Sequence, residues 1–310
     1  MKARCLFGLL ALTPLIASAW DAAGHMLVGQ IAWEQTEPAA REKVEALVAT
    51  LENTYNERQP YNFVTAGCWM DDMRSKKAYA WSKWHYVTIP FTPSGSPCPI
   101  PAEGPHVVWA IHESLKILRN PSAPAAEAAQ ALGMLIHFIG DLHQPLHATD
   151  RGDRGGNGFL IAGVPFTDLW PGTVANLHAF WDKAFRFDRG EGRIVESWAS
   201  PALPDRPKKS GEGIIAEQAR KIIAAFPVES LPQLNEVLTA EGWTRESHTI
   251  GCLAGYPVGP QPTNAEVVTL TPDFAHHAGQ IAQLRVALAG YRLARLLNRT
   301  FAPDAVATPK

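Results

Sequence analysis

The chain has 310 residues, of which 46% are hydrophobic and 19% charged, and its formal net charge at pH 7 is −2. A chain of this length and composition can bury a sizeable core. The negative net charge excludes a general electrostatic attraction to a polyanion. Any affinity for phosphate groups must therefore arise from a local feature.

The first 19 residues have the pattern of a secretory signal peptide. A basic start with Lys2 and Arg4 precedes the apolar stretch Leu6–Ile16, and the small residues Ala17–Ala19 provide a cleavage site before Trp20. The apolar stretch is shorter than the roughly 20 residues that span a bilayer. We therefore expect a secreted or periplasmic protein with no membrane anchor and no obligate protein partner. Cleavage lowers its formal charge from −2 to −4.

Hydrophobic residues recur with helical spacing along most of the remaining chain. The predicted helices are roughly Gly24–Glu34, Pro38–Leu51, Asn62–Arg74, His106–Leu118, Ala123–His147, Ala175–Phe185, Gly211–Phe226, Leu231–His248 and Pro272–Leu297. Strand signals are few. Trp84–Ile89 is a predicted strand, and Phe159–Phe166 a predicted hairpin that turns at Gly163. The Pro- and Gly-rich segments are short loops, so residues 20–310 are expected to form one mainly α domain.

Three cysteines remain after removal of the signal peptide. In an oxidising compartment, one disulfide and one thiol is the simplest arrangement. Cys98 and Cys252 both lie in sequence rich in Pro or Gly, whereas Cys68 has apolar helical surroundings. We predict a Cys98–Cys252 disulfide and a buried Cys68 thiol.

Two His/Asp pairs indicate a site with several metal ions. His137 and Asp141 are four residues apart, as are His178 and Asp182, so each pair shares a helix face, and His147 follows the first pair. One such pair is more often a satisfied core hydrogen bond than a ligand pair. Two pairs in apolar sequence favour metal binding, because burying several unpaired ionisable groups costs several kcal/mol each. Imidazole and carboxylate ligands without clustered thiolates suit catalytic zinc.

These residues belong to a longer series of motifs that resembles the S1/P1-type single-strand nuclease family. The resemblance extends over nearly the whole mature chain, and the motifs have the same order. They are Trp20–His25, Cys68–Arg74, Trp84–Val87, His137–His147, Gly155–Asn157, Asn176–Asp182 and Leu288–Asn298. The resemblance implies a helical phospholipase C/P1 nuclease-like fold with a few short strands.

The resemblance also implies three zinc ions per chain. The first would be held by Asp71, His85, His137 and Asp141. The second would be held by His147, His178 and Asp182, and the third by the main chain of Trp20, His25 and the bridging Asp141. The implied activity is hydrolysis of single-stranded DNA and RNA to 5′-mononucleotides by zinc-activated water, together with 3′-nucleotidase activity.

The same resemblance implies roles in catalysis and substrate binding for further residues. Asp71 and Arg74 are the candidate catalytic residues, and Arg74 stands where the family has a basic residue near the scissile phosphate. Tyr86 matches an aromatic residue that stacks a nucleobase, and Asn157 matches a phosphate- or base-contacting asparagine. Thr88 departs from the fungal pattern, which has an Asp that bonds the base at this position.

Two other functions are compatible with the same ligands. A zinc-dependent phospholipase C acting on phospholipid head groups resembles this family in fold, N-terminal Trp chelation and metal set. Tyr86, Arg74 and Asn157 favour nucleotides over lipids. A zinc-storage protein is the second alternative, and it fits less well because storage does not need a basic residue beside the metal ions.

Overall fold

The computed structural model describes residues 20–51, 60–74, 79–96, 98–102, 104–165, 173–195, 209–258 and 266–302. Within these ranges the chain is mainly α, with only short strands, as predicted. The α helices are α1 (Ala22–Gln35), α2 (Pro38–Val48), α3 (Phe63–Ala66), α4 (Trp69–Arg74), α5 (Val107–Leu118), α6 (Ala125–His143), α7 (Leu177–Trp181), α8 (Gly213–Ala225), α9 (Gln233–Glu236), α10 (Ala240–Ala254) and α11 (Pro272–Phe301).

The remaining elements are short. Four 3-10 helices are described, η1 (Tyr79–His85), η2 (Pro145–His147), η3 (Ala184–Arg186) and η4 (Val228–Ser230). Strand β1 (Leu160–Pro165) pairs antiparallel with β2 (Thr173–Asn176), and β3 (Phe187–Asp188) pairs antiparallel with β4 (Arg193–Ile194). The predicted signal peptide lies outside the described residues.

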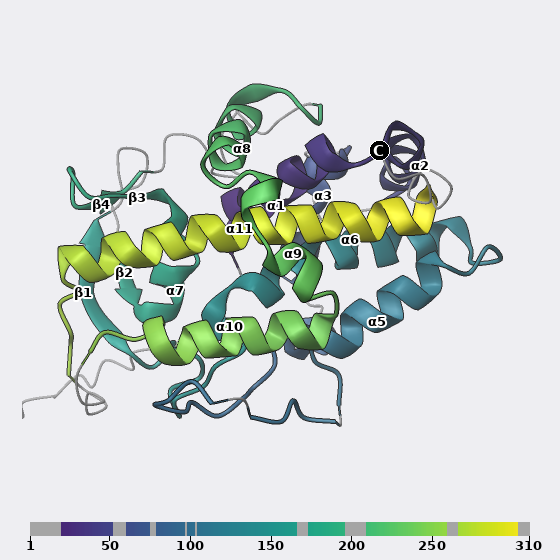
Figure 1. Cartoon of the computed structure of the whole chain (residues 1–310). Helices are drawn as coiled ribbons and strands as arrows, with labels where there is room; N and C mark the ends of the chain where they lie inside the picture. The colour runs from purple at the N-terminus through teal and green to yellow at the C-terminus, as the bar shows by residue number, and fades with distance from the viewer. Residues whose placement is uncertain are drawn as a thin grey trace, which may run out of the picture.

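Helices α1, α6 and α11 pack against one another at the centre of the molecule. The long helix α11 crosses the whole view in Figure 1, with α1 and α8 above it and α10 below. α1 packs against α11, α3, α6 and α8, and α6 packs against α5, α10 and α11. Both α1 and α6 are buried along most of their length. Polar side chains on these two helices are therefore removed from water unless they line a site.

The helix predicted for residues 62–74 is divided in two. α3 ends at Ala66, and α4 begins at Trp69. Gly67 lies between them, and its carbonyl oxygen accepts a hydrogen bond of 2.7 Å from Nδ1–H of His137. A Cβ at Gly67 would lie 3.0 Å from the carbonyl oxygen of His25. The helix breaks where the main chain contacts two candidate ligand histidines.

The helix predicted to end at His147 ends at His143. Pro145 causes this difference, because proline disfavours helical geometry in the preceding residue and cannot donate a main-chain hydrogen bond. Gln144 is accordingly extended, with φ −78° and ψ 119°. The chain then re-forms a short turn, η2, which contains His147.

Both strand predictions were wrong in detail. Trp84 and His85 belong to η1, and the segment that follows makes only an isolated bridge, between Pro90 and Asp150. Gly163 lies inside β1 instead of at a turn, because β1 takes its partner strand from residues 173–176. Helical periodicity overestimated two other segments: α7 covers only 177–181, and the helix predicted for 231–248 is divided into α9 and α10.

The predicted Cys98–Cys252 disulfide is not present, since both residues are free thiols in the structure. Cys252 lies within α10, where its Sγ accepts a hydrogen bond of 3.3 Å from the main-chain N–H of Thr92 and lies 3.5 Å from Nε2 of His248. Cys68 is buried, as predicted, and its Sγ is 3.6 Å from the carbonyl oxygen of Ala22.

None of the described helices combines the length and the apolar character needed to cross a bilayer.

Candidate metal centre and substrate cavity

Eight His and Asp residues that are scattered along the sequence come together in space. Within the described residues, three groups have ligand atoms that all lie within 4.8 Å of one another and could hold a metal ion. We name each group by one of its members. The His25 group is His25, His137 and Asp141; the Asp71 group is Asp71, His85 and His137; the Asp182 group is His147, His178 and Asp182.

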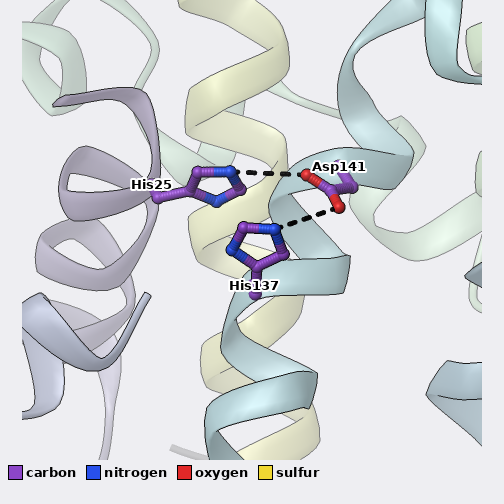
Figure 2. Close-up of side chains that lie close together, drawn as sticks. All are labelled: His25, His137 and Asp141. Carbon is purple, nitrogen blue, oxygen red and sulfur yellow. Dashed lines mark ion pairs between the residues drawn. The ribbon is translucent and has the colours of Figure 1, made fainter. Parts of the chain in front are cut away.

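Asp141 is the centre of the His25 group. Its Oδ1 lies 3.4 Å from Nε2 of His25, and its Oδ2 lies 3.3 Å from Nε2 of His137. Figure 2 shows the two imidazoles side by side, one from α1 and one from α6, both directed at this carboxylate. The two rings are stacked with centroids 3.9 Å apart. The i, i+4 spacing of His137 and Asp141 has placed both side chains on one face of α6, as predicted.

The Asp71 group shares His137 with the His25 group. Oδ1 of Asp71, on α4, is 3.9 Å from Nε2 of His137. His85, at the end of η1, places Nδ1 at 3.0 Å from Nε2 of His137 and 2.9 Å from Oδ2 of Asp141. Asp141 is thus adjacent to ligand atoms of both groups.

The Asp182 group lies where η2 meets α7. Nε2 of His178 is 3.8 Å from Oδ1 of Asp182, and the rings of His147 and His178 are stacked with centroids 5.0 Å apart. Gln144 donates from Nε2 to Oδ1 of Asp182 over 2.8 Å. Asn176 begins α7 by accepting a hydrogen bond from the N–H of Ala179, so the helix start that presents His178 is fixed locally.

Main-chain carbonyls orient three of these imidazoles. The Nδ1–H group of His137 donates to Gly67, that of His147 donates to His85 over 2.8 Å, and that of His178 donates to Gly155 over 2.6 Å. Because a carbonyl oxygen can only accept, each Nδ1 carries the proton and each Nε2 keeps its lone pair. Such a contact on the second nitrogen is the usual support of a metal-ligating histidine.

Several buried polar atoms in these groups make no hydrogen bond within the described part of the chain. They are Nδ1 and Nε2 of His25, Nε2 of His85, Oδ1 of Asp141 and Nε2 of His147. An unsatisfied buried donor or acceptor costs about 1–3 kcal/mol, so a cluster of five is unfavourable by itself. The donor set is imidazole and carboxylate, and a divalent ion among these atoms would satisfy it.

Burial keeps most of the imidazoles neutral. Desolvation lowers the pKa of His25 to about 3 and also lowers the pKa values of His85 and His147. Burial lowers the pKa of His137 too, but Asp141 and Asp71 outweigh this effect and the pKa is raised. Desolvation holds the pKa of Asp182 well above its usual value. A neutral imidazole retains the lone pair that a metal ion requires.

A cavity of about 240 Å³ lies beside the Asp182 group, and His147 and His178 form part of its wall. Tyr86 lines it with 37% of its surface exposed, and Thr88 lies on the same segment. Asn157 also lines the cavity, although its Nδ2 donates to the carbonyl oxygen of Arg154 over 2.8 Å. Tyr86 and Asn157, two of the three predicted substrate-binding residues, therefore share one cavity with the candidate ligands His147 and His178.

Two predicted site residues remain, Arg74 and Trp20, and the structure describes the side chain of Trp20 only. Arg74 is the last residue of α4, and its side chain lies outside the described part. Trp20 is fully buried and donates from Nε1 to the carbonyl oxygen of Gly140 over 2.8 Å, directly before Asp141. The start of the predicted mature chain is thus adjacent to the His25 group.

A family comparison agrees with this arrangement. The model of the family described as S1/P1 Nuclease matches residues 20–302. The chain belongs to the S1/P1 nuclease family. It is therefore an enzyme of the nuclease class, its substrates are nucleic acids, and its mainly α architecture is in line with the fold of that family.

Characterised relatives of this S1/P1 nuclease occur in fungi and plants. The chain is similar to Nuclease P1 of Penicillium citrinum, with 23% identity over 90% of this chain and 97% of the relative. It is also similar to Endonuclease 4 of Arabidopsis thaliana, with 27% identity over 94% of this chain and 93% of the relative. Nuclease S1 of Aspergillus oryzae is 25% identical over 59% of this chain and 57% of the relative.

The structure adds residues that sequence reasoning did not select. Gln144 contacts Asp182 directly, and Gly140 leaves the space that the His25 ring fills, since a Cβ there would lie 2.9 Å from Nδ1 of His25. Asp150 and Arg154 line the cavity of this S1/P1 nuclease. Gln144 and Gly140 both lie within the His137–His147 motif. Their position between the candidate ligands is the sequence feature that could have indicated a role at the site.

Proposed function

We propose that this nuclease is a secreted, zinc-dependent phosphodiesterase that hydrolyses single-stranded DNA and RNA to 5′-mononucleotides and removes the phosphate of 3′-nucleotides. The observation that carries the proposal is the presence of three His/Asp groups, one of which, the Asp182 group, borders a cavity lined by Tyr86. The metal ligands would hold ions that act on a phosphate group, and the exposed aromatic ring would stack against a nucleobase.

Three zinc ions are proposed, in the arrangement expected from the family resemblance. Asp71, His85, His137 and Asp141 would hold one ion, and His147, His178 and Asp182 a second. The main chain of Trp20 would hold the third with His25 and Asp141. This last site is supported by the hydrogen bond that anchors the Trp20 indole to Gly140, next to Asp141.

The proposed ions would make an acidic protein locally attractive to phosphate. Three zinc ions and the carboxylates of Asp71, Asp141 and Asp182 leave the centre with a charge of about +3. When bound, zinc lowers the pKa of a coordinated water to about 7 and neutralises charge on phosphate oxygens. The chain's own residues contribute the geometry: Gly67 and Gly155 fix His137 and His178, and Gln144 holds Asp182.

Asp71 and Arg74 are the proposed catalytic residues. Asp71 is the most exposed of the three candidate ligand carboxylates, with 21% of its side-chain surface accessible. Arg74 follows it by three residues on α4, and one helical turn brings positions three apart to the same face. A guanidinium there would stabilise charge that develops on the phosphate in the transition state.

Single-strand preference follows from Tyr86. Stacking of a base on an aromatic ring contributes about 1–3 kcal/mol and tolerates any base sequence. A duplex hides its bases, so a strand must be unpaired to make this contact. Asn157 would contact the same nucleotide from the opposite segment of the cavity wall. Thr88 does not offer the carboxylate that the fungal pattern has at this position.

One assay tests this function. Metal-replete protein that begins at Trp20 is incubated with single-stranded DNA, single-stranded RNA, duplex DNA, a 3′-nucleotide and phosphatidylcholine. We expect rapid hydrolysis of both single strands to 5′-mononucleotides, phosphate release from the 3′-nucleotide, slow attack on the duplex and loss of all activity with a chelator. Faster hydrolysis of phosphatidylcholine than of RNA would instead assign a phospholipase C, and zinc binding without turnover of any substrate would assign zinc storage.

A further inference from the structure

Arg154 lines the cavity but has no role in the proposed hydrolysis. It lines the same cavity as His147 and His178, from the loop between η2 and β1. It is the only Lys or Arg among the cavity-lining residues, and its side chain is exposed. Among the described residues it forms no ion pair with a carboxylate, unlike the buried Arg285 and Arg292.

The backbone at Arg154 is unusual. Its φ is +60°, and it is the only residue other than glycine with positive φ in the described part of the chain. L-residues rarely adopt this region, and strained conformations of this kind cluster at binding sites. Asn157 stabilises the conformation, because both its main-chain N–H and its Nδ2 donate to the Arg154 carbonyl oxygen, over 3.4 and 2.8 Å. The loop thus fixes the place from which the guanidinium extends.

The acidic residues of this loop are engaged with the main chain. Oδ1 of Asp150 accepts hydrogen bonds from the N–H groups of Gly152, Asp153 and Gly155, over 3.0–3.1 Å. Oδ1 of Asp153 accepts from the N–H of Gly156 and from the Tyr256 hydroxyl. Their negative charge is therefore spread over loop amides, and the Arg154 guanidinium is left for an anion in the cavity.

We propose that Arg154 binds a phosphate group of the nucleic-acid strand adjacent to the scissile phosphodiester. This inference rests on the proposed nuclease function and names a residue that sets affinity for a chain of nucleotides. A flexible, exposed guanidinium suits a solvent-accessible phosphate of the continuing strand, whereas the reacting phosphate is adjacent to the buried His and Asp groups. Arg154 acts on binding and leaves the chemical step unchanged.

The test compares Arg154→Asn with the wild type in steady-state kinetics on a single-stranded oligonucleotide and on a 3′-mononucleotide. Asparagine accepts positive φ, so the loop is kept while the charge is removed. We expect the KM for the oligonucleotide to rise about five- to tenfold, with kcat unchanged and the KM for the mononucleotide within about twofold of the wild type. The slope of log KM against log salt concentration should fall by about 0.7, the contribution of one phosphate contact on a single strand.

Three further variants serve as controls. Arg154→Gly also fits the backbone and repeats the test if the asparagine variant does not fold. Arg154→Lys keeps the charge and should keep the wild-type salt slope. Arg119→Asn removes another exposed arginine, which caps the C-terminal end of α5 and does not line the cavity, and should behave as the wild type.

The outcomes are distinct. A KM and salt slope of Arg154→Asn equal to those of Arg119→Asn would overturn the proposal. A similar loss on the mononucleotide, or a fall in kcat alone, would also overturn it, because the contact would then be with the reacting nucleotide. If the wild type hydrolyses no nucleic acid, the proposed function fails. Binding of a fluorescent oligonucleotide to metal-replete protein then decides the role of Arg154 independently.

Discussion

Oδ1 of Asp141 lies 3.4 Å from Nε2 of His25, across the contact between α6 and α1. The second oxygen of the same carboxylate lies 2.9 Å from Nδ1 of His85 and 3.3 Å from Nε2 of His137. One side chain therefore connects the His25 group with the Asp71 group, while the Asp182 group has a carboxylate of its own. This difference makes the carboxylates experimentally distinguishable.

Replacing Asp141 should remove more metal than replacing Asp182. We expect Asp141→Asn to lose about two zinc ions per chain and Asp182→Asn about one, because Asp141 is proposed to contact two ions. Elemental analysis after dialysis at equal free zinc measures both. Equal losses in the two variants would show that Asp141 serves only one ion.

Gly140 should be required for zinc binding and activity, because a side chain at this position would displace His25. In Gly140→Ala the new Cβ would lie 2.9 Å from Nδ1 of His25, which is buried and cannot move without repacking. Misplacement of a site residue by about 1 Å can cost about 10²-fold in rate, so we expect at least a tenfold loss of activity together with loss of zinc. Gly133→Ala is the matched control on α6, because its Cβ would crowd Trp69 and Leu51. That variant should lose stability of about 1–3 kcal/mol and retain zinc; loss of zinc from both would contradict a specific role for Gly140.

Metal-free protein should become less stable as the pH falls from 7 to 5. Burial lowers the folded-state pKa of five histidines, which are His25, His85, His143, His147 and His248. Their contribution to stability is therefore complete above the unfolded pKa of about 6.5 and is lost as the pH falls towards the folded pKa. His25 alone, with a folded pKa of about 3, contributes about 1.4 kcal/mol per pH unit in this range.

Two groups act in the opposite direction. The pKa values of His137 and Asp182 are raised, so their contributions are present at low pH and are lost as the pH rises. These two groups do not offset the five histidines with lowered pKa values. Urea unfolding of chelated protein at pH 7 and pH 5 measures the net effect, and His25→Gln should reduce the difference. Equal or greater stability at pH 5 would contradict the predicted sign.

The Tyr86 ring should affect binding of unpaired bases. Tyr86→Ala should raise the KM for single-stranded substrates by a factor that corresponds to about 1–3 kcal/mol, because a stacking surface is lost. Tyr86→Phe keeps the ring and should behave as the wild type. Steady-state kinetics on single-stranded and duplex DNA measure the effect, and an equal loss on both substrates would argue against a stacking role.

A buried ion network behind the site should control stability. Glu246 accepts hydrogen bonds from Arg285 over 3.0 Å and from Arg292 over 2.6 and 2.9 Å, and both arginines are almost fully buried. Glu246→Gln leaves two buried cations without their carboxylate, so we expect a loss of about 2–4 kcal/mol in the free energy of unfolding. Glu113→Gln breaks the exposed pair with Lys116 and should cost less than about 1 kcal/mol. Similar losses in the two variants would show that the network contributes little.

The elements that the sequence predicted well carry local signals. The i, i+4 pairs on α6 and α7 and the periodicity of α1, α5, α8 and α11 depend on neighbouring residues, and the structure has these helices within a few residues of the predicted bounds, except for the shorter α7. The grouping of His147 with His178 and Asp182 was also expected, from the family resemblance. Local pattern and motif order were sufficient for these features.

The early end of α6 follows from the local Pro145, but the other elements that were predicted wrongly depend on distant contacts. The break between α3 and α4 follows from the approach of Gly67 to His25 and His137, which come from other helices. The partner of β1 is a segment further along the chain, so Gly163 did not form the turn that its local sequence indicated. Cys252 is placed on α10 beside His248, and loop composition alone did not predict that neighbour. Tertiary contacts, which no local pattern encodes, decided each case.

Three zinc ions are proposed to occupy the three His/Asp groups, one of which borders the Tyr86 cavity. The most direct measurement is anomalous X-ray scattering at the zinc edge from crystals of metal-replete protein that begins at Trp20. Three peaks are expected: one between His25, Asp141 and the Trp20 amine, one between Asp71, His85, His137 and Asp141, and one between His147, His178 and Asp182. Absence of peaks at these groups in protein that is active on single-stranded nucleic acid would contradict the proposed zinc sites.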